Sequence, residues 1–112
     1  MKKYNPLPKI LTIKQSNIHG LGLFAIVNIP KGTELGMCHL NINSVLIRTP
    51  LGGFYNHSDN PNCVKYEKHN KKGYANTYYY LKTIKNIMKD EELTVKYTLY
   101  KMWFYLLTRI NK

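Results

Sequence analysis

The ten residues from Phe54 to Cys63 read FYNHSDNPNC, and the interpretation of the whole chain depends on this stretch. It follows the pair Gly52-Gly53 and carries three Asn, an Asp, a His, a Ser and a Pro beside two aromatic residues. A surface turn needs about one Asn or Asp and one Gly or Pro. The stretch therefore has more polar groups than a turn requires, which predicts a loop that is built to hold something.

The length and composition of the chain indicate one globular domain. Its 112 residues are enough for one modest core, and 44% of them are hydrophobic. The formal net charge is +11, from 17 Lys and Arg against 6 Asp and Glu. This excess indicates an acidic partner such as nucleic acid or an anionic surface, although Lys is also an ordinary solubilising residue. Both interpretations stay open at this point.

Cysteine content and hydropathy argue against several classes of protein. Cys38 and Cys63 are the only cysteines, and no C-x-x-C pair is present, so we expect free thiols in a reducing compartment and no metal site. Pro6 and Pro8 interrupt the N-terminal stretch that superficially resembles a signal peptide. No uninterrupted apolar stretch is long enough to cross a bilayer. We therefore expect a cytoplasmic protein with no membrane partner.

Short apolar runs separated by turn residues predict a mainly β domain over residues 10–112, preceded by a loosely held arm over residues 1–9. We expect strands over residues 10–15, 34–39, 63–67, 74–83 and 93–97, with a short apolar run over residues 23–27. Residues 40–53 are ambiguous. Near the C-terminus, Trp103, Leu106, Leu107 and Ile110 fall on one helical face, which predicts a short helix over residues 99–110.

The stretch from Gly20 to Ala25 fits the G-x-G-x-x-A pattern of dinucleotide-binding loops. We reject that function because Pro30-Lys31-Gly32 soon turns the chain and residues 39–43 lack the acidic residue that the pattern expects. The two glycines still allow the backbone to approach a ligand and to point its N–H groups at an anion such as a carboxylate.

Three segments, taken together in this order, resemble the SET-domain protein lysine methyltransferases. The first is a G-x-G segment, here His19 to Ala25, followed by the Pro-Lys-Gly turn. The second is N-H-S-x-x-P-N, which Asn56 to Asn62 matches without a mismatch. The third is G-E-E-L-T-x-x-Y, which residues 90–97 match with Asp90 in place of Gly. The resemblance covers nearly the whole chain. In its small size, without flanking zinc modules, the sequence looks most like the stand-alone SET proteins of viruses.

The resemblance implies a β-clip fold of several short sheets with a C-terminal pseudoknot, in which the N-H-S segment threads through a loop near the C-terminus. It also implies an enzyme that moves a methyl group from S-adenosylmethionine to the ε-amine of a protein lysine and releases S-adenosylhomocysteine. Asn56 would bond the amino group of the cofactor, the backbone at His57 would meet its adenine, and Tyr97 would be the catalytic residue. The full set of cofactor-binding residues implied in this way is His19, Gly20, Leu21, Gly22, Phe54, Asn56, His57, Tyr97, Tyr100 and Trp103.

Several positions depart from the family pattern. Residues 40–53 are much shorter than in most members, which leaves the peptide groove open or leaves the second subunit of a homodimer to complete it. Val95 stands where a Phe or Tyr often limits the number of methyl groups added, which favours multiple methylation. In some relatives a Tyr after the P-N-C segment offsets this change. Tyr66 is a candidate for that role, although the alignment points to Lys65 instead.

The charge of the chain leaves two hypotheses. Enzymes that act on basic protein tails usually line their groove with carboxylates, whereas the few acids here cluster at residues 90–92. The leading hypothesis is a lysine methyltransferase of the host-cell cytoplasm, or of the nucleus in a eukaryotic host. Its substrate would be a host or viral protein that is not strongly basic, or part of a nucleic-acid-containing particle such as a ribosome or chromatin. The alternative is a catalytically weak SET-like module that binds nucleic acid through a basic, Tyr-rich surface.

Overall fold

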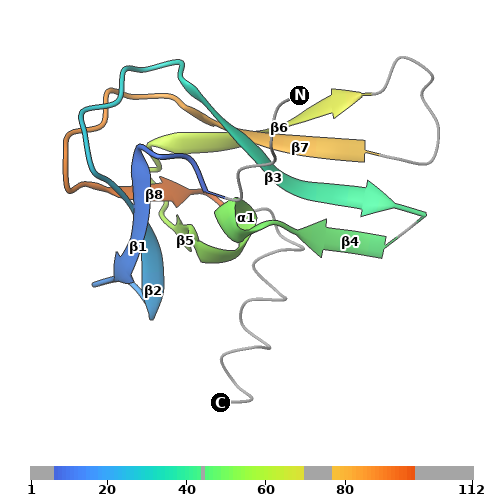
Figure 1. The fold of residues 1–112 in the computed structure, drawn as a ribbon, viewed down its shortest axis with the longest axis horizontal. Helices are drawn as coiled ribbons and strands as arrows, with labels where there is room; N and C mark the ends of the chain where they lie inside the picture. The colour runs from blue at the N-terminus through green and yellow to red at the C-terminus, as the bar shows by residue number, and fades with distance from the viewer. Residues whose placement is uncertain (1–6, 44, 70–76, 98–112) are drawn as a thin grey trace.

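The structure is a computed structural model that describes residues 7–43, 45–69 and 77–97. This part of the chain is mainly β, as predicted (Figure 1). Its strands are β1 (Leu11–Gln15), β2 (Leu21–Ala25), β3 (Glu34–Ile42), β4 (Val45–Arg48), β5 (Asn56–His57), β6 (Cys63–His69), β7 (Thr77–Thr83) and β8 (Glu92–Val95). One short helix, α1 (Pro50–Phe54), lies between β4 and β5.

The strands join into one curled sheet in the order β1-β2-β8-β6-β7-β3-β4, and β5 pairs with β8 beside this path. In Figure 1, β1 and β2 run across the direction of β6, β7 and β3. The pairs are antiparallel except where β8 meets β5 and β6. Through these two parallel contacts Asn56 lies opposite Thr94, and Cys63 lies opposite Val95. Strand β8 therefore brings the second and third sequence motifs side by side.

The β6–β7 hairpin has two unlike faces because side chains alternate along a strand. Cys63 on β6 pairs with Thr83 on β7, and both are buried. Tyr66 pairs with Tyr80 on the opposite face, and both rings are partly exposed. Aromatic and β-branched residues favour this pleated arrangement, so the run of three tyrosines in β7 forms a strand as expected.

The buried hydrophobic residues form a single core that reaches from β1 to the end of the described chain. Its members are Leu11, Leu23, Ala25, Ile29, Leu35, Cys38, Leu51, Tyr55, Cys63, Leu81, Ile87, Leu93, Val95 and Tyr97. The core includes Tyr55 beside the N-H-S segment and both Val95 and Tyr97 of the third motif. The candidate site is thus built directly on the core, whose packing holds its backbone in place.

The five strands expected from the sequence are confirmed, with bounds that agree within three residues. The first three residues of the strand expected over residues 74–83 lie outside the described part of the chain. The ambiguous residues 40–53 complete β3 and form β4 and α1. Thr49 caps α1 by accepting a hydrogen bond on its side chain from the N–H of Gly52, and Pro50 opens the helix. The expected helix over residues 99–110 lies outside the described residues, as does most of the expected N-terminal arm. No helix in the described part of the chain is long and apolar enough to span a membrane.

Candidate functional site

The side-chain amide of Asn56 joins the first sequence motif to the third. Its Nδ2 donates to the carbonyl oxygens of His19 and Leu21, each at 3.2 Å, and to Oε2 of Glu92 at 2.8 Å. Asn56 is only 4% exposed, so these bonds form largely out of water. Among the described residues, no hydrogen bond reaches its Oδ1. The amide therefore fixes the backbone of the G-x-G segment and leaves one acceptor oxygen for a ligand.

Gly22 allows this close approach because a larger residue would not fit. A Cβ at this position would collide with the carboxylate of Glu92 and would lie 3.1 Å from Nδ2 of Asn56. The same carboxylate accepts a hydrogen bond from Oγ of Ser16 at 2.8 Å. Gly20 has a φ of 49°, in the left-handed region that glycine adopts easily. The glycines thus serve packing and backbone conformation, and their contact with a ligand stays a prediction.

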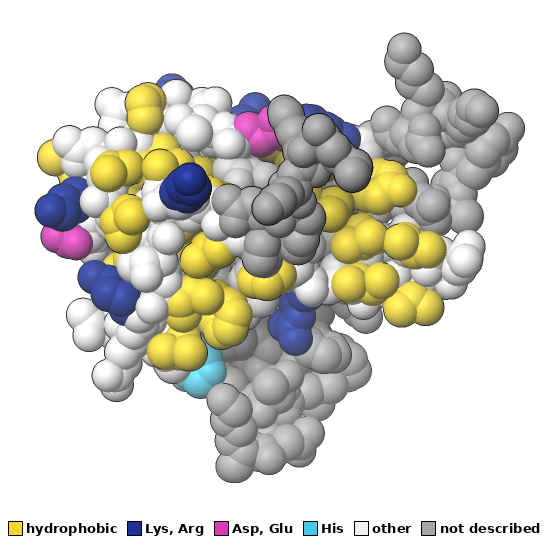
Figure 2. Space-filling model, viewed as in Figure 1, with side chains coloured by type: hydrophobic (Ala, Val, Ile, Leu, Met, Phe, Trp, Pro, Cys, Tyr) yellow, Lys and Arg dark blue, Asp and Glu magenta, His cyan; other side chains and the backbone are white. Residues whose placement is uncertain are grey.

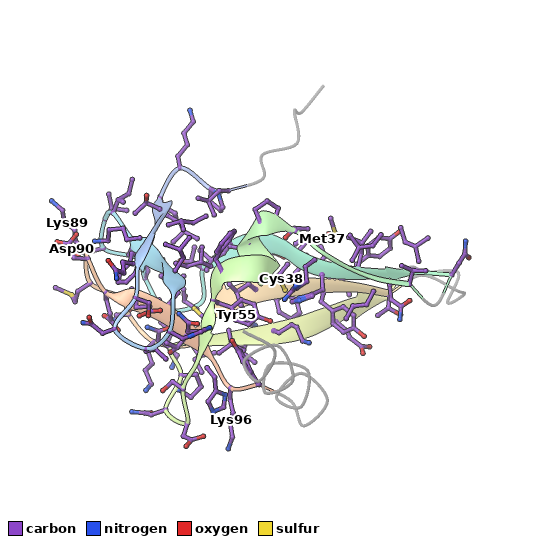
Figure 3. The ribbon with its side chains drawn as sticks, turned by 90° about the horizontal axis from the view of Figure 1, so that it is seen from below. Met37, Cys38, Tyr55, Lys89, Asp90 and Lys96 are labelled. Carbon is purple, nitrogen blue, oxygen red and sulfur yellow. The ribbon has the colours of Figure 1, made fainter. Side chains whose placement is uncertain are left out.

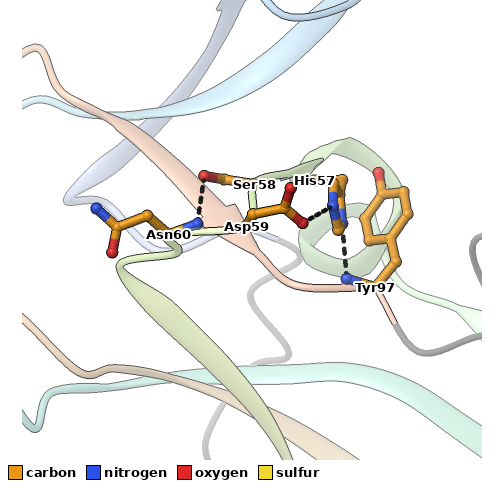
Figure 4. A network of polar contacts seen from close by, with 5 residues as sticks. All are labelled: His57, Ser58, Asp59, Asn60 and Tyr97. Carbon is orange, nitrogen blue, oxygen red and sulfur yellow. Dashed lines mark hydrogen bonds and ion pairs between the residues drawn. The ribbon is translucent and has the colours of Figure 1, made fainter.

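The imidazole of His57 connects the N-H-S segment to the end of β8 (Figure 4). Its Nδ1 accepts a hydrogen bond from the backbone N–H of Tyr97 at 2.9 Å, and its Nε2 lies 3.0 Å from Oδ1 of Asp59. Because Nδ1 is an acceptor, the proton of the neutral ring is on Nε2 and is donated to Asp59. The rings of His57 and Tyr97 also meet edge to face, with centroids 5.0 Å apart. His57 therefore positions both the backbone and the ring of Tyr97.

The phenol of Tyr97 is buried, with 9% exposure, and donates its hydroxyl proton to the carbonyl oxygen of Tyr55 at 3.1 Å. A phenol hydroxyl that donates one hydrogen bond is also an acceptor by its chemistry. The ring of Tyr55 packs at 6.1 Å from that of Tyr97. Burial raises the pKa of Tyr55 well above its ordinary value, so this neighbouring phenol stays uncharged.

Asn62 binds the second motif to the third a second time. Its Oδ1 accepts from the N–H of Thr94 at 2.8 Å, and its Nδ2 donates to the carbonyl oxygen of Glu92 at 2.8 Å. Nδ2 also contacts Oε2 of Glu91 at 3.1 Å, and the Asn62 N–H donates to Oγ1 of Thr94 at 3.3 Å. Asn62 is 6% exposed. It closes a bridge between β8 and the loop that precedes β6.

A cleft of about 230 Å³ opens beside Tyr97. It is lined by Tyr55, Pro61, Cys63, Val64, Lys65, Ile84, Val95, Lys96 and Tyr97. Most of these side chains are apolar or aromatic, two are lysines and none is acidic. Burial, together with the nearby Glu91 carboxylate, raises the pKa of the Cys63 thiol to about 12, so this thiol is neutral. The cleft is therefore a mostly apolar surface with Tyr97 in its wall.

The structure brings together most of the predicted site residues that it describes. Asn56 contacts His19 and Leu21 directly, and Gly22 packs on the same amide. Phe54 ends α1, two residues before Asn56, and packs against the core. Tyr100 and Trp103 lie outside the described residues. The roles of all these residues in binding a cofactor stay predictions.

The question of Lys65 or Tyr66 is answered by the alternation of β6. Lys65 lines the cleft together with Cys63, as the alignment indicated. Tyr66 lies on the other face, where its hydroxyl donates to Oε1 of Glu34 at 2.6 Å. His39 is 2% exposed and its ring meets that of Tyr55 edge to face.

Sequence reasoning missed four residues that organise the site, namely Ser16, Tyr55, Asn62 and Glu92. Asn62 and Glu92 stand inside the second and third motifs, so the motifs themselves carried the signal. Ser16 and Tyr55 gave no comparable signal, because their partners lie far away in the sequence. No cluster of metal-ligating side chains occurs among residues that the structure describes.

Comparison with known proteins agrees with this geometry. The family description "SET domain" matches residues 37–98, more than half of the chain. No curated protein sequence matches the chain. Among solved structures, the fold is similar to that of a candidate histone methyltransferase from Plasmodium falciparum, with a TM-score of 0.66 and 24% sequence identity. That match covers 83% of this chain and 96% of the other, and at this identity it bears on the fold alone. The chain belongs to the SET-domain family.

Proposed function

We propose that this chain is a protein-lysine N-methyltransferase that uses S-adenosylmethionine as its methyl donor. One observation carries the proposal, which is the junction of the three motifs at a single place. Asn56 bonds to the backbone of the first motif, and the next residue, His57, holds Tyr97 of the third. The cleft that Tyr97 lines would then receive the lysine side chain of the substrate.

The residues present fit the proposed cofactor. Asn56 uses its Nδ2 within the protein, and its Oδ1 is an acceptor suited to the ammonium of the cofactor's methionine part. Gly20 and Gly22 keep the adjoining backbone free of bulky side chains. When bound, the cofactor supplies an electrophilic methyl group on a sulfonium. We propose that its adenine meets the backbone of His57 and that Phe54 also contacts the cofactor. Tyr100 and Trp103, outside the described residues, are proposed to close the site.

Tyr97 has the role of orienting the incoming amine. Displacement at a methyl group is in line, so the amine must be uncharged and aligned. The Tyr97 hydroxyl donates a hydrogen bond to the carbonyl oxygen of Tyr55, and its oxygen would accept one from an N–H of that amine. The cleft lining has no carboxylate that would stabilise the ammonium form, and its apolar residues disfavour charge. The ammonium therefore loses its proton to solvent before transfer.

The number of methyl groups depends on the space around the amine. Val95 is buried in the cleft wall and is smaller than the aromatic residue common at this position. Lys65, rather than Tyr66, faces the same cleft, so no second tyrosine restores the lost bulk from β6. We therefore propose that the enzyme adds more than one methyl group.

The proposals on partners and location depend on composition and on the resemblance to small viral SET proteins. We propose a host or viral protein as substrate, inside the host cell. A homodimer is supported by edge strand β4, where Val45, Leu46 and Ile47 are 59%, 50% and 42% exposed. Figure 2 shows hydrophobic side chains gathered over this part of the molecule. An exposed apolar edge strand is a surface that other chains can pair with.

A second candidate function, nucleic-acid binding, is favoured by the open face of the β6–β7 hairpin. The ammonium of Lys68 lies 4.3 Å from the ring centroid of Tyr80, and that of Lys82 lies 5.1 Å from the centroid of Tyr66. Interleaved tyrosines and lysines suit the bases and phosphates of a single strand. Tight RNA binding that weakens steeply with salt, together with no methyl transfer to any cell extract, would favour this candidate.

The proposed function is tested in two steps. Calorimetry with S-adenosylhomocysteine measures cofactor binding, and incubation with labelled S-adenosylmethionine and fractionated lysate, followed by mass spectrometry, identifies a methylated protein. Tyr97→Phe should retain cofactor binding and lower turnover by about 100-fold or more. Tyr80→Phe makes the same change on the open face of β7 and should leave both quantities unchanged. Absence of cofactor binding by the unmodified protein contradicts the proposal.

A further inference from the structure

The cleft beside Tyr97 is positively charged at its wall and at its rim. Lys65 follows Cys63 by two residues on β6, so both side chains point to the cleft face of the strand. Its Nζ lies 5.0 Å from the ring centroid of Tyr79. Lys96 directly precedes Tyr97 and is exposed, and Figure 3 shows its side chain reaching outward at the edge of the molecule. Two cations therefore lie in the lining of the cleft that contains Tyr97.

A third lysine lies close to the same rim. The Nζ of Lys85 binds Oδ1 of Asn60 at 2.7 Å. Asn60 and Lys85 are the sequence neighbours of Pro61 and Ile84, which both line the cleft. The positive charge is thus spread over several sides of the opening rather than placed on one wall.

The nearest carboxylates lie outside the lining of the cleft and make their contacts there. Asp59 faces the imidazole of His57, and Glu67 accepts a hydrogen bond from Tyr79. Glu91 accepts from Asn62 and from the N–H of Met88. Glu92 is held by Ser16 and Asn56 on the side of the G-x-G segment. No acidic side chain is among the lining residues of the cleft.

A peptide entering this cleft brings its residues on both sides of the target lysine close to Lys65 and Lys96. Arginine or lysine at those positions would meet like charges, whereas Asp or Glu would meet opposite charges. The net charge of +11 adds a long-range attraction for acidic segments, and salt weakens this attraction. The discrimination is therefore expected in peptide binding and in KM more than in kcat.

From this geometry we infer that the cleft selects a target lysine flanked by acidic residues, with Lys65 and Lys96 as the residues that determine this specificity. The inference rests on the proposed function, because it names the substrate class of the same site. The proposed specificity differs from that of SET proteins that act on strongly basic tails. A groove suited to such tails is lined by carboxylates, whereas the lining of this cleft has two lysines and no acidic residue.

The test uses three peptides of equal length with one central lysine, flanked within two positions on each side by Asp, Ser or Arg. Binding is measured by fluorescence anisotropy with S-adenosylhomocysteine present, and methyl transfer is measured as kcat and KM with labelled cofactor. We expect affinity and kcat/KM to fall about tenfold from the Asp peptide to the Ser peptide, and further to the Arg peptide. The differences should shrink at about 0.5 M salt.

Charge-reversal variants assign the effect to the cleft. Lys96→Glu and Lys65→Glu should weaken binding of the Asp peptide and strengthen binding of the Arg peptide. Because Lys65 is partly buried, Lys96→Glu and Lys96→Gln at the exposed position keep the test valid if Lys65→Glu fails to fold. Lys89→Glu makes the same charge change at an exposed position that Figure 3 places on another side of the molecule. It should retain the original order of the peptides.

The outcomes separate this inference from the proposed function. Equal binding of the three peptides, or tighter binding of the Arg peptide, overturns the inference even if methyl transfer occurs. The expected binding order, reversed by Lys96→Glu and not by Lys89→Glu, supports it even where no peptide is methylated. Absence of transfer to every peptide and every lysate fraction counts against the proposed function alone.

Discussion

Truncation of Asn62 to alanine should destabilise the protein far more than the same change two residues earlier. Asn62 is 6% exposed and its side chain bonds to the Thr94 N–H and the Glu92 carbonyl, each at 2.8 Å. Asn60 is exposed, and its side chain is held only by the ammonium of Lys85 among the described contacts. The pair Asn62→Ala and Asn60→Ala therefore compares a buried bridge with a surface contact at nearly the same place.

The size of the effect follows from what the alanine leaves behind. A buried backbone donor or acceptor that loses its partner costs about 1–3 kcal/mol. Asn62→Ala removes the side-chain partner of the Thr94 N–H and of the Glu92 carbonyl oxygen. We therefore expect a loss of about 3 kcal/mol in the free energy of unfolding. The contact with the exposed Glu91 adds little. Asn60→Ala should change the free energy of unfolding by less than about 0.5 kcal/mol, as is usual at a surface.

Urea unfolding followed by circular dichroism measures both variants. With an m-value of about 1.5 kcal/mol/M, a loss of 3 kcal/mol lowers the midpoint by about 2 M. Asn62→Ala should also weaken S-adenosylhomocysteine binding in calorimetry, because the strand that leads to Tyr97 loses its support. If the two alanine variants unfold at the same urea concentration, then Asn62 is not the bridge that holds β8 to the loop, and the reasoning is refuted.

Three further predictions concern packing, pH and thiol chemistry. Gly22→Ala should lower the free energy of unfolding by about 1–3 kcal/mol, because its methyl would displace the Glu92 carboxylate from Ser16 and Asn56. Gly53→Ala, where a Cβ meets nothing within 4 Å, should leave the urea midpoint unchanged. Equal midpoints for the two variants would contradict the close packing at Gly22. Hydrogen bonds from Lys68 and then Tyr66 hold the pKa of Glu34 below its ordinary value of about 4.5, so the stability they provide is present above that pH and is lost as pH falls through the folded-state pKa. Glu34→Gln should therefore show a smaller fall of the urea midpoint below pH 4.5 than the unmodified protein; the residue is exposed, so the difference is small, and parallel pH profiles would exclude it. Cys38 and Cys63 are 0% and 1% exposed, and the pKa of Cys63 is raised to about 12. At pH 8 an aromatic disulfide reagent should therefore label both thiols only as fast as the protein opens. Rapid labelling without urea would contradict the burial of these thiols.

The sequence by itself determined the family and most of the strands. The G-x-G, N-H-S and E-E-L-T segments are local patterns, and each is readable without knowing what lies beside it. The predicted strands agree with the structure within a few residues because turn residues mark their ends and aromatic or β-branched residues fill them. Residues 40–53 could not be assigned, since a short apolar run such as Val45 to Ile47 suits an edge strand and a buried helix equally well.

Only the tertiary structure decided how the motifs work together. The Nδ2 of Asn56 donates hydrogen bonds to His19, Leu21 and Glu92. These contacts depend on the parallel pairing of β5 with β8, which no local sequence pattern encodes. The choice of Lys65 over Tyr66 for the cleft depends on which face of β6 turns to the core, and the buried Cys63–Thr83 pair sets that face. Local propensity acts between near neighbours in the chain, whereas packing between distant segments decides the partners of a buried polar group. For the same reason, only the folded sheet shows that Lys65 and Lys96 line the cleft.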